Sequence, residues 1–237
     1  MRVGIFGDSF GDDADNFDPN IPSWIECIRQ QGHLVDNYCK AGTNLWFSYK
    51  QFLKNHENYD KVILLVTWPG RIEINEKNTL TELGKYWTVN NIFTAYDSTK
   101  DSGRKQQLQF LKDYVINLYD PEKETMLHKA ILNEIKLARE DVILYPCHAS
   151  SIEHTDDLPL WEVTEFENST MSGDNRYGVY KARGFIDARC CHMTAPNHKV
   201  VANMFIDRIN GKESKLTKDL LVPVSGSFES YMKKANW

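Results

Sequence analysis

Met1-Arg-Val-Gly-Ile-Phe-Gly-Asp-Ser-Phe-Gly11 is the stretch of sequence that decides the fold. Its apolar run stops abruptly at Gly7-Asp8-Ser9, which predicts a buried first strand followed by a tight turn. Ligands bind at the carboxyl ends of the strands in open parallel sheets. Ser9 is therefore a candidate nucleophile, flanked by glycines that let a substrate approach the backbone. The alternative is a Ser/Asp turn that only caps the following segment.

Length and composition indicate one ordinary globular domain, which we expect to span residues 1–237. Hydrophobic residues make up 41% of the chain and charged residues 26%, so a core can form without disulfides or metals. The 28 basic side chains are outnumbered by 33 acidic ones and form no stripe. Because phosphate neutralisation needs clustered lysine and arginine, we expect no nucleic-acid partner.

The five cysteines show no CxxC spacing, which favours reduced thiols in a cytosol-like compartment. No stretch approaches the roughly 18 apolar residues of a membrane span, and the N-terminus lacks the pattern of a secretory signal. We therefore expect a cytoplasmic protein with no membrane partner. Association with a virus particle and export by another route stay open, and the sequence predicts no oligomeric state.

Apolar patterns along the chain alternate between strand and helix. This alternation predicts an α/β protein with a three-layer, flavodoxin-like parallel sheet of about five strands. Residues 70–103 and 148–185 show no regular period and are expected to form irregular excursions. The expected strands after the first are 33–39, 62–66 and 142–145, and the expected helices are 22–31, one from Leu45 onward, 108–119, 127–138 (burying Leu127, Ala130, Ile131 and Ile135) and 195–209.

A histidine block precedes the last expected helix. It reads Asp187-Ala-Arg-Cys-Cys-His192-Met-Thr-Ala-Pro-Asn-His198, with Thr194 as the expected N-cap. Serine hydrolysis needs a hydroxyl, an imidazole that accepts its proton, and donors that face the developing oxyanion. Ser9 and His192 supply the first two at the same expected edge of the sheet. The alternative is a structural histidine.

Three blocks, spread over roughly residues 1–210, match one known pattern. They are Gly7-Asp8-Ser9-Phe10, Asn37-Tyr-Cys-Lys-Ala-Gly42-Thr43, and His192-Met-Thr-Ala-Pro-Asn-His-Lys-Val-Val-Ala202. In this order they resemble the nucleophile, glycine and histidine blocks of the SGNH (GDSL-type) serine hydrolases. The resemblance implies an esterase with Ser9 as nucleophile and His192 as base, and with the backbone N–H groups of Ser9 and Gly42 holding the oxyanion.

The chain departs from this family after the third strand. The family carries Gly-x-Asn-Asp there, with its Asn in the oxyanion hole, whereas this sequence reads Thr67-Trp-Pro-Gly-Arg71. Thr67, Asn44 and Arg71 are the candidate replacements as donors. Asp8, Trp68 and Arg71 are the candidate substrate-binding residues, and the alternative for Arg71 is a surface residue paired with a nearby glutamate.

A second departure concerns the acid that orients the histidine. The family has Asp three residues before its His, and that position here is Arg189. Asp187 lies two residues further back and is the candidate acid. A two-residue displacement moves an extended chain by roughly 7 Å, so a backbone carbonyl or a carboxylate from residues 148–185 are the alternatives.

The resemblance implies a small acyl ester as substrate, such as a carbohydrate O-acetyl group. The competing interpretation is a non-catalytic binding or structural protein that keeps the SGNH-like fold but has lost the acid and the oxyanion Asn. Aromatic side chains can stack on a sugar, although each tryptophan is also a candidate core residue. The available tryptophans are Trp46, Trp68, Trp87 and Trp161.

Other kinds of site fit the sequence less well. The acidic loop after the first strand would repel phosphate, which argues against a nucleotide binder. Its aspartates lack the spacing of a calcium loop, and His148, His154 and Asp156 do not form a metal-binding motif. Cys191 lies beside His192 in sequence, whereas a catalytic Cys–His pair normally meets across the fold. We therefore expect no metal and no cofactor.

Overall fold

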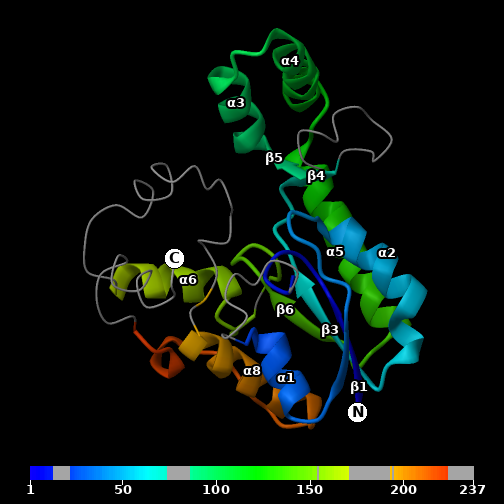
Figure 1. Ribbon diagram of the computed structural model, residues 1–237. Coiled ribbons are helices and arrows are strands. Elements are labelled where there is room, and N and C mark those ends of the chain that lie inside the picture. The colour runs from blue at the N-terminus through cyan, green and yellow to red at the C-terminus, as the bar shows by residue number, and fades with distance from the viewer. Residues whose placement is uncertain (13–21, 74–85, 154, 171–192, 194, 224–237) are drawn as a thin grey trace.

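A parallel sheet forms the centre of the molecule (Figure 1). The computed structural model describes residues 1–12, 22–73, 86–153, 155–170, 193 and 195–223. Within these residues the sheet has four strands in the order β2-β1-β3-β6. The strands are β1 (Arg2–Phe6), β2 (Leu34–Asn37), β3 (Lys61–Val66) and β6 (Ile143–Pro146).

The order of the strands confirms the predicted fold class. Counted along the chain, the strands of this sheet lie in the order 2-1-3-4, which is the flavodoxin-like arrangement. All pairs are parallel, with Phe6 beside Leu64 and Val66 beside Pro146. The described sheet has four strands rather than the expected five or so.

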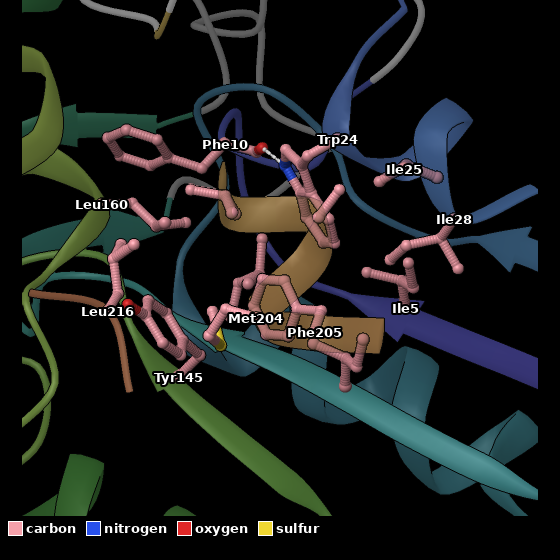
Figure 2. Close-up of a cluster of buried hydrophobic side chains, with 14 of the residues drawn as sticks. Ile5, Phe10, Trp24, Ile25, Ile28, Tyr145, Leu160, Met204, Phe205 and Leu216 are labelled. Atoms are coloured by element: carbon pink, nitrogen blue, oxygen red, sulfur yellow. Dashed lines mark hydrogen bonds between the residues drawn. The ribbon is translucent and has the colours of Figure 1, made fainter. Parts of the chain in front are cut away.

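Helices cover both faces of the sheet and complete three layers (Figure 1). Alternate strand residues point to opposite faces, so Ile5 and Ile63 join one apolar cluster and Phe6 and Leu64 the other. Figure 2 shows the first cluster, in which Trp24 stacks on Phe205 at 4.7 Å between ring centroids. The helices over this face are α1 (Trp24–Gln30) and α8 (Ala195–Ile209), and those over the other are α2 (Leu45–Asn55) and α5 (Pro121–Ala138).

The described parts of the two expected excursions contain some regular elements. After β3 the chain forms an antiparallel hairpin and two helices, whose small core contains Ile92, Leu108 and Leu111. The second excursion contains a helix as well, while residues 171–185 lie outside the described part. These elements are β4 (Arg71–Glu73), β5 (Tyr86–Thr88), α3 (Val89–Ser98), α4 (Ser102–Asn117) and α6 (Leu160–Thr170), and two 3-10 turns lie at His56–Asn58 and Lys218–Leu220.

Two helices begin earlier than predicted, α4 at Ser102 rather than 108 and α5 at Pro121 rather than 127. The last helix has the predicted bounds, although its expected N-cap, Thr194, lies outside the described residues. In α5 the predicted apolar face is half right: Ile131 and Ile135 pack against the core, whereas Leu127 and Ala130 are exposed and His128 is buried instead. No helix in the described part of the chain is both long and apolar enough to cross a membrane.

Candidate active site

Ser9 lies in the turn that follows β1 at its carboxyl end. The turn is closed by the Gly11 N–H, which donates to the Asp8 carbonyl at 3.1 Å. The Phe10 N–H donates to the Asp8 carboxylate, also at 3.1 Å. These two bonds bracket Ser9, which is partly exposed, and so fix its backbone at the corner of the turn.

Asp8 is an anchor for this turn. Its carboxylate is 0% exposed and accepts a 2.7 Å hydrogen bond from the Thr67 hydroxyl. The Cys147 thiol, from the end of β6, lies 3.5 Å away, and burial raises the pKa of that thiol. The substrate-binding role expected for Asp8 stays a prediction, while its observed contacts are those that hold the turn. Thr67 has given its hydroxyl hydrogen to Asp8, so that hydroxyl does not donate to an oxyanion.

Arg71 lies between the nucleophile turn and the glycine loop. Its Nη1 is 3.3 Å from Asp8 Oδ2 and donates to the Thr43 carbonyl at 2.7 Å. The Arg71 side chain is 16% exposed, so it is not the surface residue that the alternative interpretation supposed. A single guanidinium nitrogen thus joins the residue before Ser9 to the residue after Gly42.

The glycine loop is bonded directly to the end of β1. The Lys40 N–H donates to the Gly7 carbonyl at 3.1 Å, and the Thr43 hydroxyl lies 3.3 Å from the same oxygen. Gly42 adopts a φ of +74°, which favours glycine because a Cβ would be strained there. Asn44 caps α2, with its side-chain oxygen accepting from the Phe47 N–H at 3.0 Å.

The start of α8 is tied to the nucleophile turn through Trp24. The Trp24 indole N–H donates to the Phe10 carbonyl at 2.7 Å, as Figure 2 shows. The Trp24 backbone N–H donates to His198 Nδ1, in the first turns of α8, at 3.2 Å. Met193 is buried in the same apolar cluster as Phe10. His192 and Asp187 lie outside the described residues, as do Arg189, Cys190 and Cys191.

His148 lies at the carboxyl edge of the sheet, close to Phe10 of the nucleophile turn. The sequence suggested it only as a candidate metal ligand. Its ring stacks on Trp161 at 5.4 Å and meets Phe10 edge-on at 6.0 Å between centroids. Burial lowers the His148 pKa, and its buried Nε2 has no hydrogen-bond partner among the residues that the structure describes. His154 lies outside the described residues, and the described residues contain no group of three metal-ligating side chains.

The tryptophans do not form one platform. Trp46 is 46% exposed on α2, whereas Trp161 packs against the cluster on the opposite face of the sheet. Trp68 follows Thr67 at the site and packs close to Gly70, where any added side chain would meet its ring. The Trp87 side chain lies outside the described part. Of the tryptophans considered for stacking on a sugar, Trp68 and Trp161 are the described ones that lie near the nucleophile turn.

A hollow of about 390 Å³ opens in the loop after β6. None of the residues predicted for the site lines it, and its Asp157 pairs with Arg208. It is therefore separate from the nucleophile turn. Its lining residues are Ala149, Ile152, Glu153, Thr155, Asp157 and Pro159.

Comparisons with known proteins give little beyond the fold already described. No family model matches the chain, and no curated protein matches it. Among solved structures, a lipase/acylhydrolase from Enterococcus faecalis aligns with 89% of this chain and 96% of its own chain. The sequence identity is 14% and the TM-score is 0.37, and a likeness this distant carries no argument about the reaction.

Proposed function

We propose that this protein is a serine esterase that cleaves small acyl esters, with Ser9 as nucleophile and His192 as general base. The observation that carries the proposal is the position of Trp24, which hydrogen-bonds both the residue after Ser9 and the first turns of α8. Since α8 begins three residues after His192, this contact supports a meeting of the two catalytic side chains at the carboxyl edge of the sheet.

The reaction follows the acyl-enzyme route. The Ser9 hydroxyl attacks the acyl carbon while His192 accepts its proton, and the carbonyl electrons move onto the oxygen. Backbone N–H groups of Ser9 and Gly42 stabilise this oxyanion. When the carbonyl re-forms, the alcohol leaves with the proton from His192, and water then releases the acid by the same steps in reverse order.

The substrate class is a short acyl ester, for instance an O-acetyl group on a carbohydrate. Trp68 supports this substrate class because it is the residue after Thr67, and the Thr67 hydroxyl contacts the carboxylate of Asp8 beside Ser9. An indole at the site offers an apolar face on which a sugar ring or a short acyl chain can stack.

Initial rates on 4-nitrophenyl acetate test the proposal. We expect Ser9→Ala and His192→Ala each to lower kcat by about 10⁴-fold or more, since the members of such a unit act together. Ser102→Ala, at the exposed start of α4, is the matched control and keeps the full rate. The activity should also survive a chelator. Hydrolysis that is unchanged by Ser9→Ala, or absent from the native protein, would favour the non-catalytic interpretation.

The acid that orients His192 is tested separately. Loss of a true triad aspartate costs about 10⁴-fold in turnover in the serine protease that serves as the general template. We expect Asp187→Asn to cost only a few-fold, because its displacement along the chain favours a backbone carbonyl or another carboxylate as the partner of His192. A loss of several orders of magnitude would instead assign the acid to Asp187.

A further inference from the structure

We infer that Arg71 is the side-chain donor of the oxyanion site, and that Asp8 holds it in place for this purpose. The inference rests on the proposed function, since it assigns a further catalytic residue to that reaction. Its geometric basis is that one guanidinium contacts both the residue before Ser9 and the residue after Gly42, the two residues proposed as backbone donors.

The guanidinium is fixed at two points. Arg71 Nη1 donates to the Thr43 carbonyl at 2.7 Å and lies 3.3 Å from Asp8 Oδ2. Asp8 precedes Ser9 and Thr43 follows Gly42, so the anchors flank both backbone donors. Asp8 is itself held by the Thr67 hydroxyl at 2.7 Å and is fully buried. The planar Arg71 guanidinium is therefore held in position before the reaction begins, as oxyanion stabilisation requires.

Donors remain on this guanidinium after its two contacts are counted. Arginine has five N–H donors, and both described contacts of Arg71 use Nη1. Its Nε and Nη2 make no hydrogen bond within the described part of the chain, and the side chain is partly open to solvent at 16% exposure. Arg71 therefore has spare donors that a bound ligand can reach.

The other side-chain candidates are less well placed. The Thr67 hydroxyl hydrogen is committed to Asp8. Asn44 uses its side-chain oxygen to cap α2, which turns that group toward the helix, although its amide hydrogens remain. Arg71 is thus the donor that the contacts favour, and Asn44 is the one that an experiment must separate from it.

Arg71 acts on charge and transfers no proton. As the Ser9 oxygen bonds to the acyl carbon, the carbonyl electron pair moves onto oxygen, and a hydrogen bond from Arg71 stabilises the new charge. The proton of Ser9 goes to His192, and arginine stays protonated throughout. Asp8 neutralises the guanidinium before the reaction, so the hydrogen bond from Arg71 to the acyl oxygen becomes strongest when that oxygen turns into an oxyanion. The effect should therefore appear in kcat rather than in KM.

Arg71→Lys, assayed on 4-nitrophenyl acetate, tests the assignment. Lysine keeps a positive charge beside Asp8 but loses the fork, so we expect kcat to fall by about 10²- to 10³-fold with KM changed less than about 3-fold. Arg139→Lys is the matched control, because Arg139 is similarly buried and donates to three carbonyls, those of His56, Tyr59 and Asp60, without touching the site. It should lower stability and leave kcat unchanged.

Three results would overturn the inference. They are a kcat within about 3-fold of the native value in Arg71→Lys, a change confined to KM, and a loss of kcat in Asn44→Ser in place of Arg71→Lys. If Arg71→Lys does not fold, Arg71→Gln takes its place, because the glutamine amide keeps hydrogens that can be donated to the Thr43 carbonyl and the Asp8 carboxylate. The same fall in kcat is expected, and a kcat within about 3-fold of the native value would overturn the inference. A native protein that hydrolyses no ester contradicts the proposed function instead, so the two failures are distinct.

Discussion

The two edges of the central sheet both carry Asp–Arg pairs, but they use them differently. At the carboxyl edge, Asp8 is 0% exposed and pairs with Arg71. At the amino edge, Asp141 is 48% exposed and pairs with Lys61 and Arg139. The amino-edge pairs lower the pKa of Asp141 and join β3 to the end of α5, where solvent screens the charges.

Burying the Asp8 carboxylate costs more free energy than leaving Asp141 exposed to solvent. Taking a carboxylate out of water costs several kcal/mol, and its partners recover that only when the geometry is good. Apolar residues of similar volume often give equal or greater stability in such a place. A buried ion pair beside Ser9 is therefore better explained by the position it imposes on the nucleophile turn than by any gain in stability.

Neutralising each aspartate gives the largest expected contrast between the edges. Asp8→Asn should lower the free energy of unfolding by about 3 kcal/mol, since it leaves Arg71 without its buried partner. It should also lower kcat by about 10²-fold, because the Ser9 turn shifts. Asp141→Asn should cost less than about 1 kcal/mol and leave kcat unchanged. Urea unfolding and ester hydrolysis measure both effects, and equal losses at the two sites would refute the contrast.

Two glycines, one in β1 and one just after it, separate a loss of stability from a loss of activity. A Cβ on Gly7 would lie 2.6 Å from the Leu65 Cβ, and one on Gly4 would collide with the Tyr59 ring. Either alanine variant should lose about 1–3 kcal/mol of stability through overpacking. Only Gly7→Ala should also lower kcat, because it displaces the turn that carries Ser9. Assays at a temperature where both variants stay folded decide this, and a lower kcat in Gly4→Ala would argue against it.

His148→Phe should raise stability at the carboxyl edge. Phenylalanine keeps the aromatic contacts with Trp161 and Phe10 but removes the buried Nε2, which has no hydrogen-bond partner in the described part of the chain. We expect the free energy of unfolding to rise by about 1 kcal/mol, because an unsatisfied buried polar atom is costly. A fall in stability in thermal or urea unfolding would mean that this nitrogen has a favourable interaction.

The smallest expected effect is a loss of stability at acidic pH. Helix α5 contacts the carboxyl edge through His128, whose Nε2 lies 2.9 Å from the Ser151 carbonyl, and the amino edge through Arg139, which does not titrate. Burial lowers the His128 pKa, so below about pH 6.5 the unfolded chain binds more protons and stability falls as pH falls. Urea unfolding from pH 7 to 5 should show a flatter profile in His128→Gln. An unchanged profile would contradict this.

The sheet and its main helices were predictable because their signals are local. Strands buried on both faces appear as continuous apolar runs, as at Val62–Val66, and the helix at 195–209 has a clear period. The three-residue strands β4 and β5 are too short to show any period, which explains why residues 70–103 looked irregular. In α5 the apolar face turned out to include His128, which a hydrophobic pattern does not reveal.

The candidate site was only partly predictable for a different reason. The position of Ser9 follows from local sequence, but the side chains that contact the Asp8 carboxylate come from 59 or more residues away. No short-range pattern indicates that Thr67 and Arg71 turn toward one buried carboxylate. The same holds for His148, whose aromatic neighbours Phe10 and Trp161 come from two other segments.

Covalent labelling with a fluorophosphonate probe, followed by peptide mapping, tests most directly whether Ser9 is an activated nucleophile. An activated serine attacks such a probe, whereas an ordinary surface hydroxyl does not. One labelled site is expected, at Ser9, with labelling lost in Ser9→Ala and strongly slowed in His192→Ala. Folded native protein that takes up no label, or that carries it on another residue, would contradict this expectation.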